Sequence, residues 1–297
     1  MKGRLSSYII AAVIFLAAAV ISCKKKIPIS SISLNSYKAA LIVGETLELT
    51  ASIYPSDAGN QTITWMSRNP DVADVTNDGM VTALASGTTL IGAFANDGSE
   101  ERAICTLNVH TTTMQMTSSS PYITLRAEAA SVVWGDGSVS LMQEVSNSNN
   151  ATFIKNNHSG TDTIRILGDN ITILTCFNNR LTSLNVSKNP ALQELYCSGN
   201  QLTSLDVNKN TELTSFICDF NQLTSLDVSN NTMLTYLSCQ NNELSAAALD
   251  ALFYTLPDNF IPGAMKSINI NGNPGTGSCT PSIAVKRGWL VVNTTIW

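Results

Sequence analysis

Four cysteines recur at intervals of 21 residues, a pattern that raises the question of metal binding or disulfide formation: Cys176, Cys197, Cys218 and Cys239. Zinc sites use close pairs such as C-x2-C, which these cysteines do not form. Neighbouring strands, about 4.8 Å apart, would lie within disulfide range. In-register side chains on one face are parallel, however, and this strains such a bridge. We therefore expect free thiols that pack as small apolar side chains in a dry core.

Few other residues offer catalytic chemistry. The chain has only two histidines, His110 and His158, which restricts both metal binding and acid–base catalysis. It contains no nucleophile motif, P-loop, G-x-G-x-x-G or H-E-x-x-H sequence. Asp136 lies in a W-G-D-G turn and has no carboxylate partner at a useful spacing. The sequence therefore predicts no enzyme, no metal ligands and no cofactor.

Aspartates in turns leave calcium binding open as an alternative. Asp206 and Asp227 align with Asn185 in a second ladder of oxygen-bearing side chains. Three more aspartates lie in turns of the N-terminal region: Asp57, Asp78 and Asp97. Turns select aspartate because its side chain accepts hydrogen bonds from nearby backbone amides. We expect these residues to form turns.

The cysteines belong to a repeat of 21 residues, of which LQELYCSGNQLTSLDVNKNTE (residues 192–212) is one unit. An asparagine follows each cysteine by three residues and a leucine follows by five. A fixed period of this length with L-x-x-L-x-[L/C]-x-x-N-x-L is typical of a leucine-rich repeat solenoid, whose units bury their apolar faces only against neighbours. The unit resembles the internalin-like bacterial leucine-rich repeats with nested half-repeats. That resemblance implies a binding scaffold that uses its concave face.

Side chains alternate along each repeat strand, so Leu195 and Cys197 should point inward while Glu194 and Tyr196 point outward. The same rule places an aromatic residue on or beside every rung. We predict a ligand-binding site on this face, made of Phe177, Glu194, Tyr196, Asp219, Phe220, Tyr236 and Gln240. The alternative is that the aromatics only cover the sheet surface.

Residues 30–110 predict an all-β module, because apolar residues alternate along short segments separated by turns. The segment contains V-G-E-T-L, P-S-D-A, T-W-x-S, N-P-x-V-A-x-V and G-x-V-T-A. It closely resembles the bacterial Ig-like group 2 domain, which implies an immunoglobulin-like sandwich and a bacterial surface location. We expect Trp65 to lie in its core.

Residues 111–168 predict a second β module. Trp134-Gly135-Asp136-Gly137 is a hairpin signal. With His158-Ser159-Gly160-Thr161, it resembles a shortened polycystic-kidney-disease (PKD) sandwich. The strand 163–166 nearly fits the half-repeat register, so we expect it to form the first rung of the solenoid.

Residues 169–297 should contain the solenoid and its C-terminal cap. Ser245 is a candidate helix N-cap, followed by apolar residues at helical spacing. Pro257 should end this helix. A short helix at 282–286 and a closing strand at 289–292 are expected to complete the cap.

The N-terminus has the pattern of a leader. Lys2 and Arg4 precede an apolar segment too short for a comfortable membrane span. Val20-Ile21-Ser22-Cys23 resembles the lipobox of bacterial lipoproteins. This implies a signal peptide at residues 1–22, lipidation of Cys23, a tether at 23–29 and an outer-membrane anchor facing the cell surface or the periplasm.

The net charge of −5, with no basic cluster beyond residues 24–26, argues against nucleic-acid binding. The sequence therefore predicts a mainly β, multidomain, lipid-anchored envelope protein that binds a protein or glycan ligand. Two alternatives are a structural envelope component and a carbohydrate-binding accessory protein.

Overall fold

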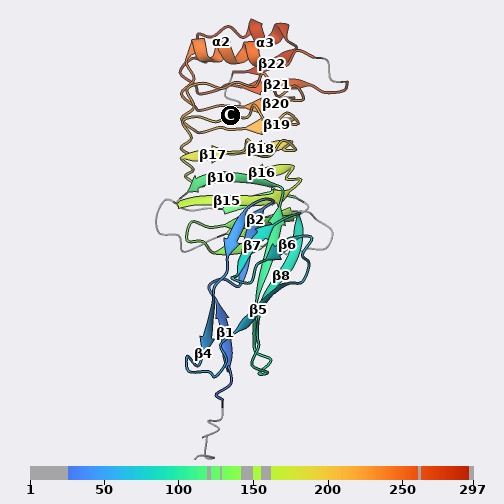
Figure 1. Cartoon of the computed structure of the whole chain (residues 1–297). Coiled ribbons are helices and arrows are strands. Elements are labelled where there is room, and N and C mark those ends of the chain that lie inside the picture. Colours follow the sequence, from blue (N-terminus) through green and yellow to red (C-terminus); the bar gives the residue numbers. More distant parts are fainter. Residues whose placement is uncertain are drawn as a thin grey trace, which may run out of the picture.

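The computed structural model describes residues 26–118, 122–127, 129–141, 150–154, 162–259 and 262–293. The chain is mainly β and forms two stacked parts, with the N-terminal strands at one end and a coiled solenoid above them (Figure 1). Each part has its own apolar core. Within the described residues, no helix is both long and apolar enough to cross a membrane. The predicted leader, Cys23 and His158 lie outside the described residues.

The N-terminal part consists of nine strands in three sheets. The strands are β1 (Ser31–Leu34), β2 (Lys38–Ile42), β3 (Thr46–Glu48), β4 (Ala51–Tyr54), β5 (Ile63–Ser67), β6 (Ala73–Val75), β7 (Met80–Ala83), β8 (Gly87–Ala95) and β9 (Arg102–His110). They pair as β1-β4, β2-β9-β8-β5 and β3-β7-β6. Trp65 is buried between the sheets, as the alternation of its strand predicts.

The solenoid is organised around one sheet of in-register parallel strands. These are β16 (Ile173–Thr175), β18 (Glu194–Tyr196), β19 (Ser215–Ile217), β20 (Tyr236–Ser238), β21 (Lys266–Asn269) and β22 (Trp289–Val292). In five successive rungs the inward side chain is fully buried: Leu174, Leu195, Phe216, Leu237 and Ile268. The 21-residue period therefore stacks like residues upon like, as predicted.

The ladder asparagines hold the turns of the coils together. Asn221 donates from Nδ2 to the carbonyls of Cys197 and Cys218, both at 3.0 Å, and its Oδ1 accepts from the amide of Leu202 at 3.0 Å. The same arrangement recurs at Asn200 and Asn242. Together these amide groups satisfy backbone groups of successive coils that would otherwise be buried without partners.

The cysteine ladder is buried and unbridged. All four thiols are free, and the Sγ atoms of Cys197, Cys218 and Cys239 donate to carbonyls of the following coil at 3.5–3.6 Å. Burial raises the pKa of Cys176 to about 12 and raises the pKa of the other three as well. The thiolate is therefore strongly disfavoured, and the thiols pack as apolar side chains.

A maleimide reagent tests this burial. Six described cysteines are free, and only Cys279 is partly exposed. In a C23S background we expect Cys279 alone to react in the native protein, slowly because burial raises the pKa of its thiol. All six should react after denaturation. A C279S variant should then show no native labelling, and labelling of the ladder cysteines in the folded chain would contradict the packing described here.

In the described part of the chain, the predicted PKD-like sandwich shares one core with the solenoid and is not a separate unit. Its strands are β10 (Thr112–Ser118), β11 (Tyr122–Arg126), β12 (Ala129–Val133), β13 (Val139–Leu141), β14 (Asn150–Ile154) and β15 (Asp162–Asp169). β11 pairs with β16, and β10 pairs with β17 (Ser183–Asn185), so both sheets continue directly into the solenoid. Met114, Ile164 and Leu195 belong to one continuous core. These strands are the N-terminal cap of the solenoid.

Two details of the cap differ from the sequence prediction. β15 is not the first rung, because β10 lies between it and β17. The half-repeats at 203–207 and 224–228 bury their leucine and valine side chains but form no strands. The half-repeat at β17 does form a strand, because it pairs with β10. The hairpin at Trp134–Gly137 forms as predicted and joins β12 to β13.

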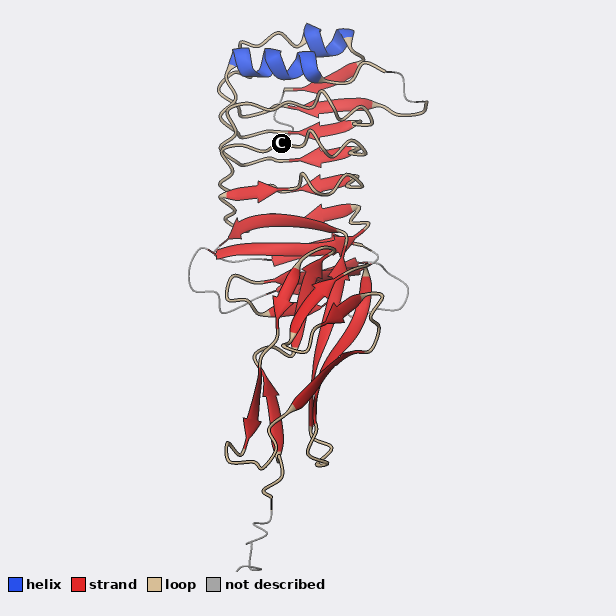
Figure 2. Cartoon of the chain, in the orientation of Figure 1, coloured by secondary structure: helices blue, strands red, loops and turns tan. Residues whose placement is uncertain are grey.

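The C-terminal cap agrees with the sequence pattern. Helix α2 (Ala246–Thr255) starts after Ser245, whose side chain accepts from the amide of Ala248, and its buried face covers the end of the core. Helix α3 (Ser282–Lys286) precedes β22. Figure 2 shows both helices at the end of the solenoid that lies away from the N-terminal strands.

Candidate ligand-binding site

The sheet face of the solenoid carries exposed aromatic side chains that its core does not use. Phe177 is 46% exposed, Phe220 57% and Tyr236 39%, while Tyr196 is half-buried. The inward neighbours on the same rungs are fully buried. Because the strands lie about 4.8 Å apart, these rings are spread along one narrow surface.

Three of the predicted residues, Phe177, Tyr196 and Phe220, come together around a hollow of about 580 Å³. Its complete lining is Thr175, Phe177, Asn178, Tyr196, Ser198, Gly199, Ile217 and Phe220. Glu194 lies outside the lining but accepts a hydrogen bond from the Tyr196 hydroxyl at 2.5 Å. Burial and this carboxylate raise the pKa of Tyr196, and the hydrogen bond to Glu194 orients its ring.

Asp219, Gln240 and Tyr236 do not line the hollow. Asp219 was predicted to face outward, yet it is only 8% exposed. Its carboxylate accepts from the Gln240 backbone amide and from Gln240 Nε2, both at 3.0 Å. This pair links two successive coils, so its role in the fold is structural. Tyr236 lies on the next rung, beyond the hollow.

Phe220 occupies a backbone position that other coils fill with asparagine or glycine. The residue two positions after the ladder cysteine, or after its isoleucine counterpart Ile270, has positive φ in five successive coils: Asn178 57°, Gly199 68°, Phe220 53°, Asn241 51° and Gly272 68°. A bulky residue in this left-handed conformation costs on the order of 1–3 kcal/mol. An exposed phenylalanine recovers little of this through packing. Such strain at an exposed aromatic is typical of a functional position.

Asn178 and Gly199 line the hollow but were absent from the predicted site. A Cβ on Gly199 would lie 2.1 Å from Asn178 Oδ1, so a larger residue there would force the Asn178 side chain to move. The sequence does contain a signal for both, because they stand at the position where this repeat selects asparagine or glycine.

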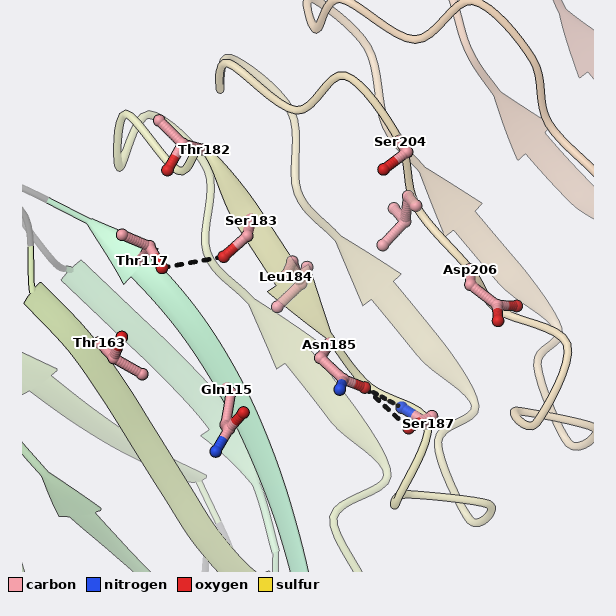
Figure 3. A pocket seen from close by; sticks show the side chains of 11 residues that line it. Gln115, Thr117, Thr163, Thr182, Ser183, Leu184, Asn185, Ser187, Ser204 and Asp206 are labelled. Atoms are coloured by element: carbon pink, nitrogen blue, oxygen red, sulfur yellow. Dashed lines mark hydrogen bonds between the residues drawn. The ribbon is translucent and has the colours of Figure 1, made fainter.

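A second hollow, of about 420 Å³, lies on the half-repeat side and is mainly polar (Figure 3). Thr117 and Ser183 hydrogen-bond across it at 2.9 Å. Asn185 and Asp206 each accept a backbone amide hydrogen bond two residues ahead, as turn-forming residues do, and Asp227 does the same. Among the described residues, no group of three or more His, Cys, Asp or Glu side chains is placed to hold a metal ion.

The junction between the two parts contains a serine, a histidine and an aspartate in contact. His110 Nε2 lies 2.8 Å from Ser131 Oγ, and its Nδ1 lies 3.1 Å from Asp169 Oδ2. Both Ser131 and His110 are buried, at 0% and 1% exposure, so no substrate reaches the hydroxyl. Asp169 also accepts from the amide and hydroxyl of Thr111. The cluster therefore connects β9 to the cap strands and does not form a catalytic centre.

This junction predicts a dependence of stability on pH. Burial lowers the pKa of His110 below its ordinary value of 6.5, with Asp169 opposing the shift. The folded state thus favours neutral imidazole, and the unfolded chain takes up the proton first as pH falls. The stabilisation is complete above the unfolded pKa and is lost as pH falls towards the folded pKa. We expect the Tm to fall as the pH drops below about 6.5, the ordinary pKa of histidine. The H110Q variant should lack this component, and an equal fall in both proteins would contradict the assignment.

Comparison with known proteins supports the assignment of the N-terminal part. Residues 28–106 match the family model of the bacterial Ig-like domain (group 2). Two uncharacterized proteins of Clostridium acetobutylicum are 36% identical over 80 residues and 37% identical over 82 residues, which is 27% and 28% of this chain. An alpha-L-arabinofuranosidase of Bifidobacterium longum is 37% identical over 67 residues, 23% of this chain and 6% of that protein. The matched segments span only 8% and 21% of the two clostridial proteins.

Solved structures also resemble parts of the chain. The functional domain of InlJ from Listeria monocytogenes, which includes a cysteine ladder, is 33% identical with a TM-score of 0.32, covering 39% of this chain and 23% of that one. An intimin mutant from EHEC O157:H7 is 19% identical with a TM-score of 0.23, covering 32% of this chain and 54% of that one. The family match shows that this mainly β chain contains a bacterial Ig-like group 2 domain at residues 28–106.

Proposed function

We propose that this chain is a lipid-anchored protein of the bacterial cell envelope that binds a protein partner through the hollow around Phe177, Tyr196 and Phe220. The observation that carries this proposal is the strained, exposed conformation of Phe220. The fold would be more stable with glycine there, so the ring is retained for contact with a partner. Tyrosine and other rigid aromatic residues are frequent in protein interfaces, where they supply much of the binding energy.

The composition of the hollow favours a protein partner. Phe177, Ile217 and Phe220 give it an apolar surface, its lining residues carry no charge, and the nearby Glu194 is engaged by Tyr196. This is a small apolar centre that polar groups surround, as in protein interfaces. A glycan that stacks on the rings is the second ligand class to test. The role requires no catalytic residue.

The anchor and the Ig-like domain fit this role. Val20-Ile21-Ser22-Cys23 supports lipidation of Cys23, and two or more acyl chains suffice for stable anchoring. The Ig-like domain would then hold the solenoid away from the outer membrane, towards the cell surface or the periplasm. Metabolic labelling with palmitate tests the anchor: the wild-type chain should incorporate label, and a C23S variant should not.

The experiment that tests binding screens the purified chain against extracellular-matrix proteins and glycans. For any hit, Tyr196→Ala should weaken binding by about 2 kcal/mol, the level of an interface hot spot. Tyr254→Ala is the matched control, because Tyr254 is 65% exposed on α2 and should leave the affinity unchanged. A chain that binds nothing in the screen, or a hit that is insensitive to Tyr196→Ala, would contradict the proposed site and favour a structural envelope role.

A further inference from the structure

The outer face of the four-stranded sheet in the Ig-like domain has an unusual composition. Strand register places nine outward positions in a three-by-three grid over β5, β8 and β9. The rows read Thr64, Phe94, Arg102; then Met66, Gly92, Ile104; then Arg68, Leu90, Thr106. Four apolar side chains therefore surround a glycine, where a solvated sheet face would carry polar residues.

A hollow of about 440 Å³ lies on this face, and Gly92 is among its lining residues. A Cβ on Gly92 would lie 2.5 Å from the ring of Phe94 and 2.9 Å from Cδ1 of Ile104, so these two side chains lean over the glycine. Met66 is 56% exposed beside them. The surface is thus apolar and accessible, and such surfaces mark interaction sites.

Two arginines stand at diagonally opposite corners of the grid. Arg68 and Arg102 are both exposed, and in the described part of the chain neither guanidinium group has a carboxylate partner. No acidic residue occupies any of the nine positions. Their Cα atoms are about 16 Å apart, given strands about 4.8 Å apart and a rise of about 3.3 Å per residue. This local positive charge contrasts with the net charge of −5.

From this arrangement we infer a second interaction surface, which binds an extended acidic segment of a partner protein. An apolar side chain of the segment occupies this hollow and packs against Met66, Phe94 and Ile104. Carboxylates on either side, about five residues apart in an extended chain, pair with Arg68 and Arg102. A second copy of this chain fits poorly, because a symmetric face-to-face dimer would bring four guanidinium groups together without counter-charges.

Panning of a random peptide library on the purified chain tests this inference. We expect enrichment of peptides with acidic residues on both sides of an apolar residue. The best peptide should bind the R68E/R102E variant at least about tenfold more weakly, because two charge-assisted contacts become repulsive. Its affinity should also fall as salt rises, because salt screens exposed charges.

Two controls separate this surface from others. The K188E/K209E variant makes the same charge change at exposed lysines of the solenoid and should bind normally. Tyr196→Ala should also bind normally, which keeps the result independent of the proposed solenoid site. Peptides without acidic enrichment, or an affinity unaffected by R68E/R102E, would overturn the inference. Arginine-dependent binding to phosphatidylglycerol vesicles without any peptide selection would assign the surface to a membrane and overturn it as well.

Discussion

Replacing Asn221 by alanine should lower the free energy of unfolding by roughly 2–6 kcal/mol, because one buried backbone amide loses its partner, at about 1–3 kcal/mol, and two buried carbonyls each lose one of two donors, at about 0.5–1.5 kcal/mol each. The amide is that of Leu202, and the carbonyls are those of Cys197 and Cys218, which keep Asn200 and Asn242 as donors. The loss is a large fraction of the 5–15 kcal/mol that stabilises a typical domain. Urea denaturation should show a much lower transition midpoint for the solenoid.

The control for this variant is Asn230→Ala, at an exposed position in the same repeat. Its side chain makes no hydrogen bond to the described residues, so the free energy of unfolding of this variant should stay within about 0.5 kcal/mol of the wild-type value. Equal midpoints for the Asn221 and Asn230 variants would mean that the asparagine ladder does not stabilise the coils.

Phe216→Ala should destabilise the solenoid by about 3–5 kcal/mol, the usual cost of removing a buried aromatic side chain. Phe216 is fully buried at the centre of β19, in the stack where Leu195 precedes it and Leu237 follows. The truncation leaves a cavity between coils that neighbouring side chains cannot fill.

Phe216→Leu separates packing from other effects, because leucine is the residue that the flanking rungs use at this position. The leucine variant should lose much less stability than the alanine variant. Equilibrium unfolding measures the free energy of unfolding of both. If the leucine variant were as unstable as the alanine variant, the rungs would not be equivalent units of a repeating core.

Much of the solenoid was predictable because its information is local and repeated. The period defined the buried positions, and the residues that follow Ser245 defined the helical cap. The N-terminal cap was harder, because the hairpin at Trp134–Gly137 is local but the pairing of β10 with β17 joins distant segments. The PKD-like motif therefore predicted a hairpin but not that the neighbouring strands would pair with strands of the solenoid.

At the candidate site, the alternation of inward and outward side chains predicts orientation only within the strands. β19 ends at Ile217, so the two-residue period no longer governs Asp219, whose carboxylate turns towards Gln240. Phe220 has no strand register either. Its position could have been identified by aligning it with Asn178, Gly199 and Asn241, since only phenylalanine departs from the residues suited to positive φ.

The central claim, that Phe220 is retained for binding at a cost in stability, is tested most directly by Phe220→Gly. Glycine adopts positive φ without strain, so the free energy of unfolding should rise by about 1 kcal/mol. Affinity for a partner found in the screen should fall by about 2 kcal/mol. Met233→Gly is the control, because Met233 is exposed in the same repeat without positive φ, and this variant should lose about 0.5–1 kcal/mol of stability. A Phe220→Gly protein that is less stable than wild type and binds its partner with unchanged affinity would contradict the account.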